Sequence, residues 1–191
     1  MSPTIFIDSI TFQILALTGG YHRLWSHRSY NASYPLQLFL AIVGAGIAER
    51  PIVWWARLHR AHHRYTDTDL DPYGAHRGLL WSHIGWLFFK PRFVGAVDLS
   101  DLENNPIVQW QYRNYLWLSI VMTVGLPSLI AGWGWNDWVG GFVFAGATRA
   151  MIVQHVSLLC YLEYHSQLIY TAAGKFHYQQ FGTLHGGYTI R

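Results

Sequence analysis

The sequence predicts an all-α fold, in which membrane-embedded helical hairpins carry a cytosolic helical cap rich in histidine. Charged residues make up 12% of the 191 residues, against about 25% in soluble domains, and aromatic residues reach 17%. This bias is typical of chains that contact lipid. Residues 114–136 contain no charged side chain, as a membrane-spanning helix requires. Residues 59–73 carry three histidines and three aspartates in a polar stretch that suits the cap.

Length and charge limit the classes of function. At 191 residues the chain fits a single domain. Nine of its thirteen lysines and arginines fall between Arg23 and Arg92. This is a local basic zone rather than a nucleic-acid-binding surface, so no nucleic-acid partner is expected. A single cysteine, Cys160, excludes an intramolecular disulfide. The first residues lack the pattern of a cleaved signal peptide.

Two apolar segments near the N-terminus are too short to cross a membrane. Residues 9–20 run for twelve residues, whereas a spanning helix needs about 20. We expect part of a span there, or a helix buried against others, at a truncated start. Residues 36–48 lie between polar segments that bear histidines and predict an interfacial or partly embedded helix. Residues 54–92 are polar, basic and water-facing, with turns at 72–74 and 90–92.

A helical hairpin is predicted farther along the chain. Residues 114–136 form the first span, the aromatic segment 132–137 forms the turn, and residues 138–162 return with Arg149 as their only charge. Placing a charge at this depth of a membrane costs free energy unless the charge is paired or close to the membrane edge. We therefore expect Arg149 either to make a buried polar contact or to lie at the membrane edge. Both ends of the hairpin lie on the side of the basic zone, which the positive-inside rule assigns to the cytosol.

Histidine spacing predicts a metal site in the cap. On a helix, positions i, i+3 and i+4 share a face, so His59, His62 and His63 are expected to project into one site. Imidazole nitrogens suit iron, zinc, copper or nickel rather than calcium or magnesium. His22 and His27 form a second group, and their five-residue offset puts the two rings about 140° apart on an α-helix. That separation favours two neighbouring metals over one.

The side chains around these histidines each have two interpretations. Asp67, Asp69 and Asp71 could ligate a metal directly, but hydrogen bonds that fix the imidazole tautomer are the preferred role. Trp54 and Trp55 could line an apolar substrate channel, or could be tryptophans of a membrane interface. The residues alone leave both alternatives open.

Several short motifs together resemble one enzyme family. They are YHRLWSHRSY (21–30), WWAR (54–57), HRAHHRYTDTD (59–69), DPY (71–73) and SHIGW (82–86). In these motifs the chain is similar to membrane-bound acyl-CoA Δ9 desaturases of the stearoyl-CoA type, and its histidine boxes look like those of fungal members. The resemblance continues through residues 98–102 and 106–111 and covers roughly residues 14 to 155.

The resemblance implies a multi-pass enzyme of the endoplasmic reticulum membrane, with its histidine boxes on the cytosolic side. Such enzymes use two histidine-ligated iron ions, molecular oxygen and electrons from cytochrome b5 to insert a cis double bond into a saturated acyl-CoA. The implied metal ligands are His22, His27, His59, His62 and His63, and His165 falls on the spacing of a further family histidine. In the same way, Trp55 would line the acyl channel, and Arg57 and Lys90 would contact the CoA portion. Trp54, beside Trp55, is grouped with these substrate-binding residues.

The C-terminal part departs from the family pattern. The family's third histidine box, a Gly-Glu-Gly-Tyr-His-x-x-His-His run, has no counterpart before Arg191. We therefore predict a partial desaturase domain over residues 1–165 and a divergent tail over 166–191. The second iron site would lack ligands, and this polypeptide alone would be weakly active or inactive. A non-catalytic desaturase-like membrane protein and another di-iron lipid oxidase or hydroxylase are the alternatives, and homo-oligomerisation is left open.

Overall fold

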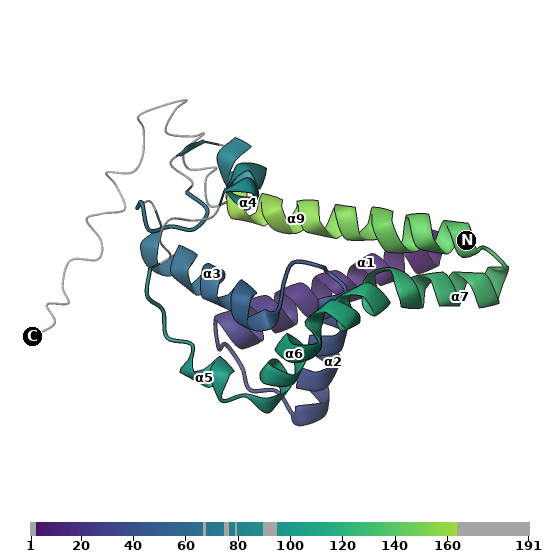
Figure 1. The fold of residues 1–191 in the computed structure, drawn as a ribbon, viewed down its shortest axis with the longest axis horizontal. Coiled ribbons are helices and arrows are strands. Elements are labelled where there is room, and N and C mark those ends of the chain that lie inside the picture. Colours follow the sequence, from purple (N-terminus) through teal and green to yellow (C-terminus); the bar gives the residue numbers. More distant parts are fainter. Residues whose placement is uncertain (1–2, 67, 75–76, 79, 90–94, 164–191) are drawn as a thin grey trace, which may run out of the picture.

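The computed structural model describes residues 3–163 except 67, 75–76, 79 and 90–94. Within these residues every regular element is a helix and there is no strand, which confirms the predicted all-α fold. Figure 1 shows a long hairpin with α7 on one arm and α9 on the other, beside α1. The helices α2, α3 and α6 are grouped away from the tip of the hairpin. His165 and the tail 166–191 lie outside the described residues.

The chain begins with a helix that is longer than the apolar pattern predicts. The helix α1 (Pro3–Leu15) continues directly into a π-helix, η1 (Ala16–Ser26). Gly20 is buried in this segment, and a Cβ there would lie 3.0 Å from the ring of Trp25 and 3.3 Å from the side chain of Leu40. Glycine thus allows close packing here instead of ending the helix. The helix therefore extends as far as the first histidine pair.

Two helices of similar length follow. The helix α2 (Tyr34–Ala45) starts near Pro35, whose fixed φ suits a first helical turn, and it is the short helix predicted at 36–48. The helix α3 (Ile52–Tyr65) carries the second histidine group.

One continuous helix of 30 residues, Pro106–Trp135, is long and apolar enough to cross a membrane, and only 11% of its most apolar 18-residue stretch is buried. It consists of α6 (Pro106–Ile120), the π-helical η4 (Val121–Gly125) and α7 (Leu126–Trp135). It starts before the predicted residue 114, because the Asn105 side chain accepts hydrogen bonds from the first amides of the helix and Pro106 follows it.

The chain then turns and runs back along this helix. Asn136, with a φ of 53°, adopts the left-handed conformation that ends α7. The return consists of α8 (Trp138–Gly140), the π-helix η5 (Gly141–Thr148) and α9 (Arg149–Glu163). Figure 1 shows α7 and the returning helix side by side and antiparallel. This arrangement agrees with the predicted hairpin.

Arg149 is buried between the arms of the hairpin. Its relative exposure is 1%. Its Nε donates to the carbonyl of Ala145 at 2.7 Å, and its Nη2 donates to the carbonyl of Thr123 at 2.8 Å. Of the two situations that the sequence left open for this charge, the structure shows the buried polar contact.

Gln111 of α6 connects the two helices that carry histidines. Its side chain is fully buried. Its Oε1 accepts a hydrogen bond from the amide of Ile52, at the start of α3, at 3.2 Å, and its Nε2 donates to the hydroxyl of Tyr21 on η1 at 2.8 Å. The amide of Ile52 is one of those that a helix start leaves without an internal partner. Gln111 therefore fixes η1 against the first turn of α3.

The remaining helices are short: η3 (Trp81–Gly85), α4 (Trp86–Phe88) and α5 (Ser100–Glu103). The main core lies beneath η1, α2, α3 and α6, and Tyr21, Trp25, Leu40 and Trp55 are among its buried residues. A second, smaller cluster contains Leu58, Tyr73, Trp86 and Leu158. The first core contains residues of η1 and α3, which carry the clustered histidines, and the second contains Leu58 of α3.

Candidate metal centre

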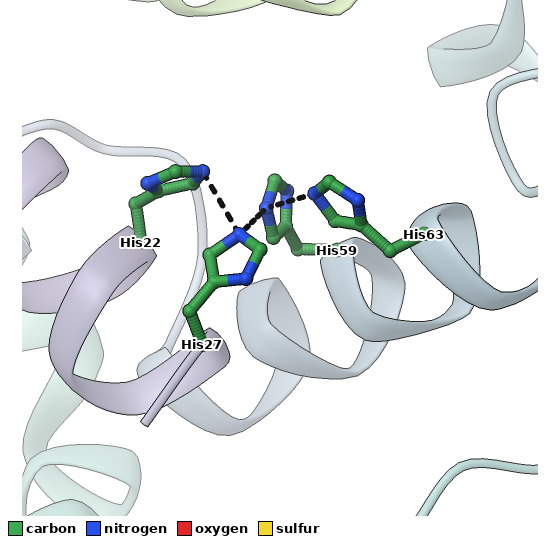
Figure 2. A group of neighbouring side chains, drawn as sticks. All are labelled: His22, His27, His59 and His63. Carbon is green, nitrogen blue, oxygen red and sulfur yellow. Dashed lines mark hydrogen bonds between the residues drawn. The ribbon is translucent and has the colours of Figure 1, made fainter. Parts of the chain in front are cut away.

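Four histidines from two helices converge. His22 lies on η1 and His27 directly after it, and His59 and His63 lie on α3; one ligand nitrogen from each lies within 4.8 Å of the others. Figure 2 shows the four rings facing one another. The Nε2 of His27 is 3.1 Å from that of His22 and 3.0 Å from that of His59, and the Nε2 atoms of His59 and His63 are 3.0 Å apart.

The π-helical turn explains why His22 and His27 meet. The prediction of divergent rings assumed an α-helix, in which residues five apart differ by about 140°. Backbone hydrogen bonds of a π-helix instead join residues five apart, so these residues stack on one face. The amide of His27 indeed donates to the carbonyl of His22 at 2.9 Å. The predicted divergence of these two rings is therefore wrong, because their Nε2 atoms lie 3.1 Å apart.

The second histidine group divides between two faces of α3. His59 and His63 join the cluster, whereas the Nδ1 of His62 lies 2.9 Å from the Oδ1 of Asp71. Both His62 and Asp71 are buried, and the His62 ring packs on Tyr73 with ring centroids 4.9 Å apart. The structure thus differs from the single site predicted for all three histidines, because His62 is bonded to Asp71 and is not among the four clustered histidines.

The surroundings of the four clustered imidazoles favour their neutral form. Burial, followed by the neighbouring histidines, lowers the pKa of His59 to about 2 and that of His63 to about 4. Burial is also the main cause that lowers the pKa of His22 and of His27. Neutral imidazole is the form that binds a metal, so these lowered pKa values favour metal binding by the cluster.

The geometry fits a transition-metal ion better than a hydrogen-bond network. A neutral imidazole has one N–H donor, yet the Nε2 of His27 meets two other Nε2 atoms, and so does the Nε2 of His59. With metal–nitrogen bonds of about 2.0–2.1 Å, ligands at 90–109° to one another lie roughly 2.8–3.4 Å apart. Three of the six nitrogen–nitrogen separations in the cluster, at 3.0–3.1 Å, fall within that range, and none of the six exceeds 4.8 Å. The residues present therefore fit a metal ion held by histidines.

A cavity of about 200 Å³ lies beside the cluster. Its walls are mainly aromatic and apolar and include Trp54, Trp55, Tyr73, Trp86 and Leu158. Trp55 separates the cavity from the histidines, because its ring stacks on that of His59 with centroids 4.8 Å apart. An apolar chain in this cavity would therefore lie one aromatic ring away from the metal ligands.

Glu49 is a candidate residue that the sequence analysis missed. Its Oε2 accepts hydrogen bonds from the Nε1 of Trp55 at 3.0 Å and from the Oγ of Ser157 at 2.9 Å. Its Oε1 is buried and has no hydrogen-bond partner among the residues that the structure describes. Burial raises the pKa of Glu49 to about 7. The only sequence signal was a single carboxylate between the apolar segment 36–48 and the tryptophan pair.

Among the other predicted site residues that the structure describes, Arg57 and Asp69 are exposed. The predicted hydrogen bond from an aspartate to an imidazole is seen for Asp71, which contacts His62. Asp67, Lys90 and His165 lie outside the described residues.

Comparison with known proteins matches nearly the whole chain to one family model, described as "Fatty acid desaturase", over residues 5–188. The chain is 47% identical over 145 residues to a probable acyl-CoA desaturase of Schizosaccharomyces pombe, an alignment that covers 75% of this chain and 30% of that protein. It is 41% identical over 158 residues to acyl-CoA desaturase 1 of Saccharomyces cerevisiae, covering 80% and 31%. For human stearoyl-CoA desaturase 5, the identity is 40% over 152 residues, covering 76% and 46%. The chain thus spans less than half the length of each relative.

Proposed function

The chain belongs to the fatty acid desaturase family, and we propose that it acts in an acyl-CoA Δ9 desaturase, which inserts a cis double bond into a saturated fatty acyl-CoA with molecular oxygen. The observation that carries this proposal is the convergence of His22, His27, His59 and His63 within 4.8 Å. A neutral, all-nitrogen ligand set suits iron. The relatives support the substrate class, since their names describe acyl-CoA desaturases.

Two iron ions are proposed, as the family resemblance implies. The four-histidine cluster would hold one of them. His62, oriented by Asp71 at 2.9 Å, would serve the second, and His165 is assigned to the same ion. Iron bound at these residues would supply the oxygen activation needed to break an unactivated C–H bond, which is beyond any side-chain base. Asp71 contributes by fixing the orientation of the His62 ring.

The acyl chain is proposed to occupy the cavity beside Trp55. Its aromatic walls favour an apolar chain and keep water from the reacting carbons. Because Trp55 lines the cavity and stacks on His59, it would hold the chain at a fixed distance from the metal. Such fixed placement determines which carbon reacts. Arg57, exposed on α3, and Lys90 are proposed to bind the phosphates of CoA.

We propose a multi-pass location in the endoplasmic reticulum membrane, with the histidines on the cytosolic side and cytochrome b5 as the electron donor. The helix Pro106–Trp135 has the length and composition of a span. Large apolar side chains are exposed along the hairpin, among them Leu116, Trp117, Val139 and Phe142. Contact with lipid would account for that exposure.

Metal content and product analysis test the proposal together. Iron per chain is measured on the full chain purified in detergent. The same chain is expressed in a yeast strain that requires added unsaturated fatty acid, and the position of any new double bond is determined. We expect bound iron and at most weak formation of Δ9 products, because the second iron site lacks ligands. The iron of the four-histidine cluster and any product should be lost in His59→Ala and kept in His155→Ala, which removes an exposed histidine outside the cluster.

Each other outcome identifies a different function. A hydroxylated lipid would support a lipid hydroxylase, and bound iron without any product would support a non-catalytic desaturase-like protein. Failure of the unmodified chain to bind iron would overturn the proposed metal centre itself.

A further inference from the structure

We propose that Asp101 is a positioning residue of the metal centre: through Arg60 and Arg28 it fixes the spacing between the two segments that carry the clustered histidines and thereby sets the affinity for the metal. The inference rests on the proposed iron site. It adds to that site three residues, none of which is among the four converging histidines.

Arg60 holds the end of η1 against α3. It directly follows His59 in the sequence. Its Nε donates to the carbonyl of Ser26 at 3.2 Å, and its Nη2 donates to the carbonyl of Trp25 at 2.5 Å. Carbonyls at the end of a helix otherwise lack partners within the helix. Because His27 follows Ser26 directly, Arg60 fixes the backbone of His27 relative to that of His59.

Asp101 of α5 holds Arg60 in this position. The Nη1 of Arg60 donates to one carboxylate oxygen of Asp101 at 2.8 Å, and its Nη2 donates to the other at 2.7 Å. Nη1 also donates to the carbonyl of Asp98 at 2.6 Å. Together with the two bonds to η1, these contacts use all five N–H donors of the guanidinium. Arg60 therefore has one well-defined position, which Asp101 fixes through a bidentate, charge-assisted hydrogen-bond pair.

Arg28 approaches the same carboxylate from the other histidine segment. It directly follows His27, its Nη2 lies 2.6 Å from one oxygen of Asp101, and its Nε lies 3.0 Å from the other. The φ of Arg28 is 52°, in the left-handed region that a non-glycine residue adopts only when its surroundings hold it there. Asp101 is thus shared by the two arginines that follow His27 and His59.

The inner half of this arrangement is shielded from water. The side chain of Arg60 is 11% exposed and that of Asp101 is 32% exposed, whereas that of Arg28 is 49% exposed. Burial opposes ionisation of Asp101, but the hydrogen bonds from Arg60 and Arg28 outweigh it and lower the pKa of this carboxyl. We therefore expect the Arg60 contact to matter more than the Arg28 contact, because solvent weakens exposed ion pairs.

Cobalt binding to the full chain in detergent tests the role of Asp101, because the visible absorption of bound Co²⁺ reports the ligand arrangement. Asp101→Asn is compared with Glu103→Gln, which neutralises an exposed carboxylate on the same short helix. We expect Asp101→Asn to raise the Kd for Co²⁺ by about 10- to 100-fold, the range for residues that orient metal ligands, and to change the Co²⁺ spectrum. Arg60→Lys is expected to act in the same direction. Glu103→Gln should leave both readouts unchanged.

The melting temperature of the metal-free chain separates positioning from a merely structural role. A lower melting temperature in Asp101→Asn with unchanged Kd and Co²⁺ spectrum would overturn the inference and leave the metal site intact. Failure of the unmodified chain to bind Co²⁺ would overturn the metal site, and the inference with it. Should Asp101→Asn not fold, Arg28→Ala decides the question, because it removes only the exposed half of the contact. It is expected to raise the Kd severalfold, and an unchanged Kd would overturn the inference.

Discussion

The backbone amide of His27 donates to the carbonyl of His22 at 2.9 Å, and the Nε2 atoms of the same two residues lie 3.1 Å apart. One π-helical turn thus aligns the backbone and the side chains of both residues. The two imidazoles are therefore brought together at the end of η1, where His59 and His63 of α3 complete the four-histidine cluster.

Replacing His27 by alanine tests this site directly. Because its Nε2 touches those of both His22 and His59, His27→Ala should raise the Kd for Co²⁺ at least about tenfold, as much as the loss of a residue that only orients a ligand. The Kd is measured by titration of the full chain in detergent, and His155→Ala serves as the control. Equal affinity in both variants would show that the four histidines do not share one ion.

The orientation of His62 gives a second prediction. His62 and His63 are adjacent in the sequence, yet His63 joins the cluster and His62 is bonded to Asp71. At one equivalent of Co²⁺, His63→Ala should lower the affinity at least about tenfold, and His62→Ala should change it less than about threefold. Similar losses in both variants would support the single three-histidine site that the spacing predicts, and would contradict the two faces seen here.

The helical hairpin could be predicted from the sequence, but the start of its first helix could not. Low charge, abundant tryptophan and the uncharged segment 114–136 were enough to predict an all-α fold with a hairpin, because composition and length determine whether a helix suits a membrane. The start of the long helix was misjudged, because Arg113 looked like a boundary. The actual start is set by the cap at Asn105, and a charge within a helix does not prevent the helix from extending.

The histidines could be identified from the sequence, but their orientation could not. Helical spacing at about 100° per residue cannot describe a π-helix, and η1 forms where Tyr21 packs edge-on against Trp25 and Trp55, a contact made in the folded protein. The partner of His62 is Asp71, which lies nine residues later and beyond the end of α3. Glu49 belongs to no motif, and only folding brings it to Trp55 and Ser157.

Glu49 predicts a dependence of stability on pH. Burial raises its pKa from the ordinary value of 4.5 to about 7, so between these values the folded chain binds more protons than the unfolded chain. This contribution to stability is complete below about pH 4.5 and is lost as the pH rises through 7. Glu49→Gln cannot ionise, and its amide oxygen can still accept from Trp55. Above pH 8 the variant should therefore be more stable than the unmodified chain by up to roughly 3 kcal/mol.

Unfolding of both chains in detergent at pH 5 and pH 8.5 measures this effect. The difference between them should be small at pH 5 and should favour Glu49→Gln at pH 8.5. The exposed carboxylate of Glu103 provides the control, because Glu103→Gln should show no such change between the two pH values. A constant difference at both pH values would show that Glu49 ionises in the folded chain as it does in water.

Arg149 links the two π-helical segments of the hairpin, since it donates to Thr123 in η4 and to Ala145 in η5. Arg149→Met would fill the space but leave both carbonyls without this donor, at about 1–3 kcal/mol for each buried group. For a chain of this size, a total loss of about 2–6 kcal/mol corresponds to a fall in apparent melting temperature of about 4–24 °C. Arg113→Met, which removes an exposed arginine of α6, should change it little. Co²⁺ affinity of the folded Arg149→Met should remain unchanged, because Arg149 is not among the clustered histidines and their bonded neighbours.

A rise in melting temperature would instead mean that the cost of burying the charge exceeds the value of its hydrogen bonds, as happens for some buried ion pairs. The arginine would then be retained for a reason other than the stability of the hairpin.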